Sequence, residues 1–293
     1  MKRSLLAFLT IAFVLLLSAC GTSEEGSSDN AENNDGDAEE EQSLFEELQE
    51  EGATVATSGT LIAATYYPEG SDELTGYDVE VMREIGERLD IDISFEEIGV
   101  DGMLPALKNG RVDMVANDFE ITEERKRDFA FSEPYKYSFT SIIVREEDMS
   151  GIETFEDIPG KVHGGGATTT HSQLAEELGA ELKTYNNVTN DVYLRDVENG
   201  RTDFIINDYY LQKLAVEALP DIDVQIHPDI KFNEAEVAVV LPKDAEELKQ
   251  KVDEAMNEMR EDGTLKELSE KFYNADVSQP PEEDIPSMDE LDL

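Results

Sequence analysis

Two polar segments that follow apolar, strand-like runs carry side chains suited to binding a small ligand. The first, residues 117–125, follows the run 112–116, and the second is the pair Asn207-Asp208. The planar guanidinium of Arg125 offers a carboxylate two charge-assisted hydrogen bonds, which a lysine cannot reproduce. The carboxylate of Asp208, far downstream, is suited to the opposite charge. We therefore predict that the chain holds a small amino acid between Arg125 and Asp208.

Both residues also have simpler interpretations. Arg125 follows Glu123 and Glu124, and exposed ion pairs between such neighbours are common and weak. Asp208 precedes a helical pattern, where an aspartate side chain caps free backbone N–H groups. Capping and ligand binding are compatible roles for one carboxylate, so the two interpretations of Asp208 do not exclude each other.

The elements that position these segments repeat one local order. A helical pattern ends in Asn-Gly, followed by Arg, any residue and Asp, and then by an apolar strand that ends in Asn-Asp. The first copy occupies residues 109–118 and the second residues 199–208. Alternating strands and helices over 44–275 predict βαβ units, a mainly parallel sheet and two lobes of about 100 residues each. Lobes built alike should present their Asn-Asp ends to each other.

Changes in composition indicate where the folded part begins and ends. Residues 21–43 are acidic and rich in Ser, Gly and Asn, and the C-terminal segment combines Pro280-Pro281 with many acids. Neither has the apolar content to offset the entropy of ordering. The last strand and helices should return to the first lobe, so that two crossings form a hinge. We predict a signal peptide 1–19, an acidic disordered tether 20–43, a first lobe 44–145, a second lobe 146–233, a return to the first lobe 234–275 and an acidic disordered tail 276–293.

The N-terminus predicts export and lipid anchoring. Lys2 and Arg3 precede an apolar core at 5–17, which is too short to span a bilayer comfortably. The sequence Leu-Ser-Ala-Cys ending at Cys20 resembles a bacterial lipobox, in which the cysteine is lipidated. Cys20 is also the only cysteine, so no disulfide is expected and stability must come from a sizeable core. We expect the protein on the extracellular face of the cell membrane.

The net charge of −46 excludes one class of partner. Phosphate contacts require Lys and Arg, so nucleic acid is not an expected partner. Most of the acids lie within 44–275, so the acidity belongs to the folded part. An acidic surface keeps a protein soluble and monomeric, and salt screens its self-repulsion. We interpret it as adaptation to a saline or alkaline exterior and expect a monomer.

Five linked motifs carry a family resemblance. They are LTGYDVEV at 74–81, DGMLPAL at 101–107, ITEER at 121–125, FSEPY at 131–135 and DGT at 262–264. Their order and spacing resemble family 3 of the bacterial extracellular solute-binding proteins, the polar amino-acid receptors of ABC importers, and especially the cystine-type receptors. The resemblance implies a two-lobe, periplasmic-binding-protein-like (type II) α/β fold with a hinge and a ligand cleft. It also implies a polar, cystine-like or cationic amino acid as ligand, a membrane permease as partner, and no cofactor, metal or catalysis.

The resemblance also implies roles for individual residues. Arg125 would hold the α-carboxylate of the ligand, and Asp208 would accept its α-ammonium from the second lobe. Three threonines open a helix, where free N–H groups favour a carboxylate, although threonines are equally common there as caps. The full candidate ligand site is Arg125, Asp208, Asn117, Asp118, Phe119, Glu120, Met103, Thr168, Thr169, Thr170 and Tyr66.

Two departures from the family pattern leave alternatives open. Residues 61–64 read LIAA where many relatives carry an aromatic residue followed by Pro-Phe, so Tyr66, Tyr67 or Phe119 would have to cover the ligand. Glu120 stands where relatives have a small hydroxyl residue. We hypothesise that Glu120 faces the cleft and favours a ligand with a second amine; alternatively, it points outward.

An enzyme and a ligand sensor are the rival functions. A few dehydratases resemble this fold and use a carboxylate in the cleft, a role that Glu120 would fill. However, the sequence has no Ser/His/Asp or Cys/His arrangement, and its three histidines lack metal-ligand spacing. His171 is the histidine nearest the site, and a surface position at the start of a helix is expected for it. A sensor would need a membrane span or signalling module, and residues 276–293 contain neither.

Overall fold

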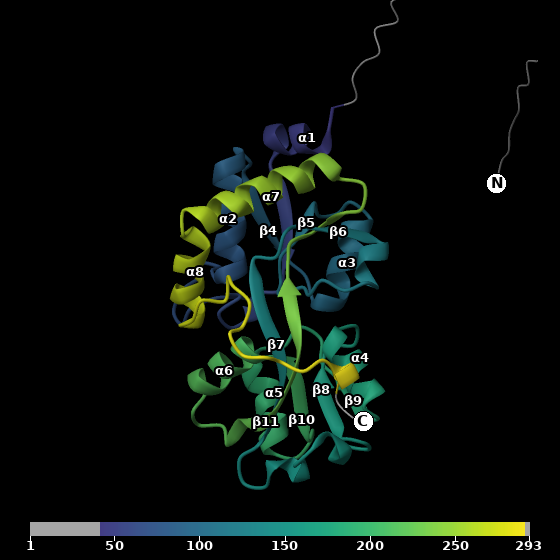
Figure 1. The fold of residues 1–293 in the computed structure, drawn as a ribbon. Coiled ribbons are helices and arrows are strands. Elements are labelled where there is room, and N and C mark those ends of the chain that lie inside the picture. Colours follow the sequence, from purple (N-terminus) through teal and green to yellow (C-terminus); the bar gives the residue numbers. More distant parts are fainter. Residues whose placement is uncertain (1–41, 291–293) are drawn as a thin grey trace, which may run out of the picture. The chain divides into compact units, whose positions relative to one another are not determined.

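The computed structural model describes residues 42–290, whose strands form two five-stranded sheets and one small hairpin (Figure 1). In the first sheet β1 pairs in parallel with β4 and β5, and the returning strand β12 runs antiparallel between β5 and β6. Its strands, in spatial order, are β4 (Ile93–Glu97), β1 (Ala53–Thr57), β5 (Met114–Val115), β12 (Val240–Pro242) and β6 (Phe129–Phe131).

The second sheet combines parallel and antiparallel pairs. Strand β8 is parallel to β9 and β10, whereas β7 is antiparallel to both β10 and β11. Both sheets are thus mixed, and the prediction of a mainly parallel sheet was wrong because the crossing strands return in the opposite direction. The spatial order is β11 (Val224–Val237), β7 (Lys136–Arg145), β10 (Phe204–Asp208), β8 (Val162–Gly165) and β9 (Glu181–Thr184). The hairpin is β2 (Thr60–Leu61) with β3 (Thr65–Tyr66).

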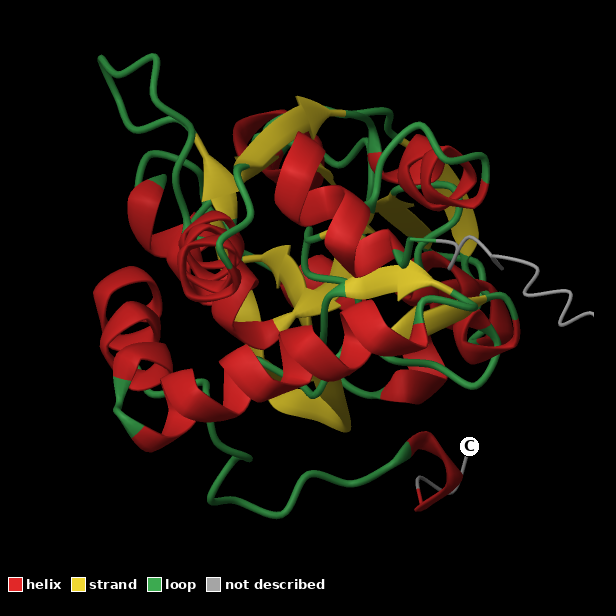
Figure 2. Ribbon diagram, turned by 90° about the horizontal axis from the view of Figure 1, so that it is seen from above, coloured by secondary structure: helices red, strands yellow, loops and turns green. Residues whose placement is uncertain are grey.

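Helices cover both faces of each sheet (Figures 1 and 2). One core of the first sheet is lined by four helices of the first lobe together with Leu211 of the second lobe, and the other by a single helix. In the second sheet, alternate strand residues such as Ile142 and Ile143 face opposite cores, as the two-residue period of a strand requires. The helices are α1 (Leu44–Glu51), α2 (Tyr77–Leu89), α7 (Glu246–Glu261) and α8 (Thr264–Tyr273) on one side of the first sheet, α3 (Val100–Lys108) on the other, and α4 (Thr170–Glu177), α5 (Asn190–Glu198) and α6 (Tyr209–Ala218) around the second.

The repeated segments fold alike up to the strand that each contains. Gly110 and Gly200 follow the helix ends with the same φ of +66°, which favours glycine. Asp113 Oδ2 accepts the N–H of Thr54 at 2.8 Å, and Asp203 Oδ2 accepts the N–H of Val162 at 2.9 Å. Each aspartate therefore ties the beginning of its own strand to the first residues of a neighbouring strand.

The lobes divide at different residues from those predicted. Strand β7, assigned to the first lobe by the predicted boundary at 145, belongs to the second sheet, and its first residue is Lys136. The crossing from the first sheet therefore falls between Phe131 and Lys136. The return crossing follows the long strand β11, which ends at Val237, and precedes β12. The predicted boundaries failed because a continuous β-rich run gives no sign of which sheet it joins.

The C-terminal segment, predicted as a disordered tail, packs on the fold as far as residue 290. Val277 is fully buried, and its carbonyl accepts the N–H of Tyr137 at the start of β7. Farther along, Asn233 in β11 donates its N–H to Pro286 and accepts that of Met288. Figure 1 shows this yellow segment running from α8 across β7 and β11. Its few apolar residues suffice because they fill gaps in cores that already exist. The predicted signal peptide and most of the tether lie outside the described residues.

Candidate functional site

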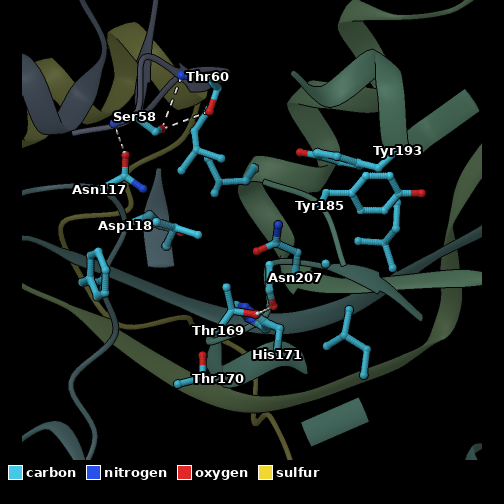
Figure 3. A pocket seen from close by; sticks show the side chains of 18 of the residues that line it. Ser58, Thr60, Asn117, Asp118, Thr169, Thr170, His171, Tyr185, Tyr193 and Asn207 are labelled. Atoms are coloured by element: carbon cyan, nitrogen blue, oxygen red, sulfur yellow. Dashed lines mark hydrogen bonds between the residues drawn. The ribbon is translucent and has the colours of Figure 1, made fainter. Parts of the chain in front are cut away.

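A cavity of about 140 Å³ lies where strands of both sheets end (Figure 3). The loops after β1 and β5 form most of one wall, and the loops after β8, β9 and β10 form most of the other. Ligands in α/β proteins bind at such carboxyl ends of strands and between lobes. The predicted residues that line this cavity are Asn117, Asp118, Phe119, Glu120, Arg125, Thr169 and Thr170.

On the first wall, Arg125 is held in place by two contacts. Its guanidinium carbon lies 4.9 Å from the centroid of the Phe119 ring, and Nη1 donates to the Glu120 carbonyl at 2.8 Å. Asn117 fixes the loop from β1, because its Oδ1 accepts the N–H of Ser58 at 2.7 Å. Of the three aromatic residues considered as cover for a ligand, Phe119 is the one that lines the cavity.

Glu120 points into the cleft and is engaged by the opposite wall. Thr170 Oγ1 donates to Oε2, and His171 Nε2 lies 3.2 Å from Oε1. Burial raises the pKa of Glu120, but the charge and hydrogen bond of His171 outweigh it and lower that pKa to about 2. Burial lowers the pKa of His171, but Glu120 outweighs it and the net shift is upward. The histidine predicted at the surface therefore lies in the cleft, paired with Glu120.

Beneath the cavity, Lys136 joins the two Asn-Asp strand ends. Its Nζ lies 2.6 Å from Asp118 Oδ1 and 2.8 Å from Asp208 Oδ2, and its side chain is fully buried. The backbone N–H of Asp118 in turn donates to Asp78 Oδ2 at 2.6 Å. Burial, together with the neighbouring carboxylates, raises the pKa of both Asp78 and Asp118 despite the attraction of Lys136. We call these four residues the Lys136 cluster.

Four predicted site residues are not among those that line the cavity. Asp208 caps α6, where Oδ1 accepts the N–H of Leu211 at 2.9 Å, while its other oxygen faces Lys136. Met103 is fully buried in the core between α3 and the first sheet. The N–H and hydroxyl of Thr168 both donate to Asp101 on α3. Tyr66 packs on the side of the first lobe formed by α2, α7 and α8.

Sequence reasoning missed several wall residues. Tyr185 and Asn187 follow the carboxyl end of β9, so the rule applied to β5 and β10 would have found them. Tyr193 gave no signal, because an aromatic residue on an amphipathic helix usually packs in a core. The rings of Tyr185 and Tyr193, 6.2 Å apart, form the aromatic part of the second wall (Figure 3).

A family model described as bacterial extracellular solute-binding proteins, family 3, matches residues 53–275. The chain belongs to this family. The predicted family is therefore confirmed, and so is the two-lobe α/β fold. Within residues 42–290, no helix is long and apolar enough to cross a membrane, and no group of three or more His, Cys, Asp or Glu is placed to hold a metal ion.

Two relatives match nearly the whole chain. The probable ABC transporter extracellular-binding protein YckB of Bacillus subtilis is 44% identical over 293 residues, which cover 98% of either chain. The L-cystine-binding protein TcyA of the same organism is 32% identical over 284 residues, or 95% of this chain and 100% of TcyA. A crystal structure of YckB aligns with a TM-score of 0.67 at 48% identity, covering 83% of this chain and 98% of that one.

Proposed function

We propose that this chain is an extracellular receptor that binds an amino acid in the cavity and delivers it to the permease of an ABC importer. The observation that carries the proposal is that a cation, Arg125, and a carboxylate, Asp118, both line the same wall of the cavity. A fixed cation and a fixed carboxylate complement the two charges of a zwitterion. The names of TcyA, an L-cystine-binding protein, and YckB, an ABC transporter binding protein, support the same class.

The side chain of Arg125 is held in one orientation, which favours binding of a carboxylate. Its guanidinium has five N–H donors, and one of its nitrogens is anchored to the Glu120 carbonyl while the plane rests near Phe119. Holding the side chain in one orientation reduces the entropy lost on binding. On the opposite wall, the start of α4 at Thr170 adds backbone N–H groups and a positive helix end, which also favour a carboxylate.

Closure of the two lobes would complete the site. Several contacts already join the walls, among them the hydrogen bonds that Thr168 donates to Asp101 and Thr170 donates to Glu120. A ligand that touches both walls stabilises the closed arrangement only by contacts that an open arrangement lacks. We propose that the permease recognises this closed form.

Binding accounts for Glu120 better than catalysis does. A general acid or base works best with a pKa near the operating pH, whereas the pKa of Glu120 is lowered to about 2. Both of its oxygens also have partners, Thr170 and His171. Glu120 therefore acts in this proposal as a link between the lobes, and the chain as a receptor and not an enzyme.

We further propose that the receptor is a monomer anchored to the extracellular face of the membrane through a lipid on Cys20, which lies outside the described residues. Partition into a detergent phase tests the anchor. Wild-type protein expressed in a lipoprotein-processing host should enter that phase, and a Cys20→Ala variant should remain in the aqueous phase. Equal partition of the two would contradict the anchor.

A thermal-shift screen of all amino acids, cystine and polyamines tests the ligand class, because specific binding stabilises the folded state. Calorimetry on the best ligand then tests Arg125. Arg125→Ala should weaken binding by at least about 100-fold, since it removes two charge-assisted hydrogen bonds. Arg127→Ala, which removes an exposed arginine nearby, is the matched control and should bind as wild type does. Near-normal affinity in Arg125→Ala would refute its proposed role.

A further inference from the structure

A third segment of the chain joins the two lobes, besides the crossings before β7 and after β11. It comprises residues 276–290, which we call the C-terminal strap. The family match ends at residue 275, so the strap lies beyond the part of the chain that family 3 describes. Figure 1 shows it leaving α8 in the first lobe and passing over β7 and β11.

One end of the strap is fixed to the first lobe. The side chain of Val277 is fully buried in the core formed by α2, α7 and α8. Ser269 of α8 holds the backbone around it, because its Oγ accepts the N–H of Val277 at 2.6 Å and donates to the carbonyl of Ala275 at 2.7 Å. The carbonyl of Val277 accepts the N–H of Tyr137 at 2.7 Å, just after the chain enters the second sheet. This end is therefore anchored beside the first crossing.

The other end of the strap is fixed to the second lobe at a β-bulge. The pairing of β11 with β7 shifts register between Phe232 and Glu234, and Asn233 between them has a left-handed φ of +49°. A bulge leaves its extra residue without a partner in the neighbouring strand. The strap supplies partners instead: the carbonyl of Pro286 accepts the N–H of Asn233, and the N–H of Met288 donates to Asn233 Oδ1, both at 2.8 Å. The side chain of Met288 packs against the second-lobe core beneath α4.

The middle of the strap is stiff and is held at one further point. Pro280, Pro281 and Pro286 have their φ angles fixed by the pyrrolidine ring, which reduces the number of conformations open to the segment. Lys231 of β11 forms an ion pair with Glu283. A stiff segment that is anchored at both ends resists a change in the distance between its anchors.

The space beneath the strap adjoins the ligand cavity. A second cavity of about 720 Å³ is lined by the loop after β5, α4, β11 and the strap residues Asp284 and Ser287. Glu120, Thr170 and His171 line both cavities, so the contact between these three residues separates one cavity from the other. A movement of the lobes that opens the ligand cavity therefore also changes the space that the strap spans.

Building on the proposed function, we propose that the C-terminal strap is a third connection between the lobes, which favours their closed arrangement and thereby raises the affinity for the ligand. Hinge movement of one lobe relative to the other has to bend the strap or release its anchor at Asn233. The strap therefore lowers the population of open forms in the ligand-free protein. A ligand that binds the closed form binds more tightly when a larger fraction of the free protein is already closed.

Distances between the lobes in the ligand-free protein test the strap directly. Spin labels on Glu87→Cys in α2 and Glu181→Cys in β9, both exposed positions, report this distance by pulsed electron paramagnetic resonance in a Cys20→Ala background. We expect one narrow distribution when the strap is intact. Deletion of residues 280–293, which keeps the anchor at Val277, should add a second, broader population. Deletion of residues 291–293 alone is the matched control and should change nothing. Identical distributions with and without residues 280–293 would overturn the proposal.

Ligand affinity gives a second readout. Calorimetry on the best ligand of the thermal-shift screen should show binding weakened about tenfold by deletion of residues 280–293, because a smaller fraction of the free protein is closed. Asn233→Gly keeps the left-handed φ but removes the acceptor of the Met288 N–H, and it should weaken binding about threefold. If the deletion variant does not fold, Asn233→Gly is used for both measurements. Wild-type affinity in a folded deletion variant would overturn the effect on binding.

The outcomes separate this inference from the proposed function. If no amino acid binds wild-type protein, the receptor function fails, while the interlobe distances still decide whether the strap restrains the lobes. If an amino acid binds and removal of the strap changes neither the distances nor the affinity, the receptor function stands and the strap proposal falls.

Discussion

The two copies of the repeated segment, residues 109–118 and 199–208, share their Asn-Gly-Arg start, their strand-anchoring aspartate and their final Asn-Asp pair, and their structures diverge at that final pair. Asn117 accepts a hydrogen bond from Ser58 in another loop, whereas Asn207 accepts the N–H of its own neighbour, Asp208. Asp118 has a left-handed φ of +55°, whereas Asp208 has a φ of −53° and caps a helix. The difference arises from the element after each strand, which is a loop in the first copy and α6 in the second.

The comparison shows that a repeated sequence repeats its local structure but not its role at the site. Within each sheet, the aspartates at 113 and 203 make equivalent backbone hydrogen bonds. Between the sheets, the terminal aspartates meet a residue that belongs to neither copy, Lys136. The two carboxylates that Lys136 contacts are not equivalent, because Asp118 lines the cavity and Asp208 does not. Substitutions at four kinds of position test this difference, in order of expected effect.

The largest effect is expected from removing Lys136. Lys136→Met should lower the free energy of unfolding by about 3–5 kcal/mol, because it leaves buried carboxylates without a counter-charge. Urea denaturation measures this change. The charge-matched double variant Lys136→Met/Asp208→Asn should recover part of the loss. A loss below about 1 kcal/mol for Lys136→Met would show that the two copies do not depend on a shared lysine.

Asp118, in the first copy, should contribute to the pH dependence of the free energy of unfolding. The pKa of Asp118 is raised by burial, so the folded protein binds this proton more tightly than the unfolded chain does. The contribution of Asp118 to the free energy of unfolding therefore falls as pH rises from about 4 toward the folded pKa, by up to about 1.4 kcal/mol per pH unit. Asp118→Asn should flatten this slope between about pH 4 and pH 7, the interval between the ordinary pKa of an aspartate and the raised pKa of Asp118.

Denaturation at a series of pH values measures the slope, and Asp203→Asn, whose carboxylate lies outside the Lys136 cluster, serves as the control. Asp78, whose pKa is also raised, remains in the Asp118→Asn variant, so a residual slope is expected. A slope identical to that of wild-type protein would count against the raised pKa of Asp118.

The strand-anchoring aspartates should give equal effects. Asp113→Ala and Asp203→Ala each leave a backbone N–H without its carboxylate partner, at Thr54 and Val162 respectively. Each should lower the free energy of unfolding by about 1–3 kcal/mol. The two losses should agree within about 0.5 kcal/mol if the copies are locally equivalent. A larger difference would mean that the likeness of the two segments ends before the strand.

The smallest effects are expected at the helix ends. Gly110 and Gly200 share a φ of +66°, which an L-residue with a Cβ adopts at a cost. Gly110→Ala and Gly200→Ala should each lower the free energy of unfolding by about 1 kcal/mol, because both sites have room for the methyl group and only the backbone is strained. Thermal denaturation of the two variants side by side detects any inequality.

The sequence by itself determined the helices and strands and the order in which they repeat along the chain. Apolar periodicity, the Asn-Gly helix ends and the polar ends of β5 and β10 are local signals, because a backbone conformation depends mainly on neighbouring residues. For the same reason Arg125 and residues 117–120 could be assigned to one wall of a cleft, since they come directly after a strand end. The linked motifs then identified family 3, as the family match over residues 53–275 confirms.

Only the tertiary structure decided which side chains meet. Lys136 was assigned no role from the sequence, yet the crossing between the sheets buries it between Asp118 and Asp208. His171 and Tyr193 lie on helices whose amphipathic pattern does not show that one face meets a cleft. The C-terminal segment has too little apolar content to fold alone, and it is ordered because β7 and β11 provide partners for its backbone. Each of these outcomes depends on contacts between residues far apart in the chain, for which local sequence carries no signal.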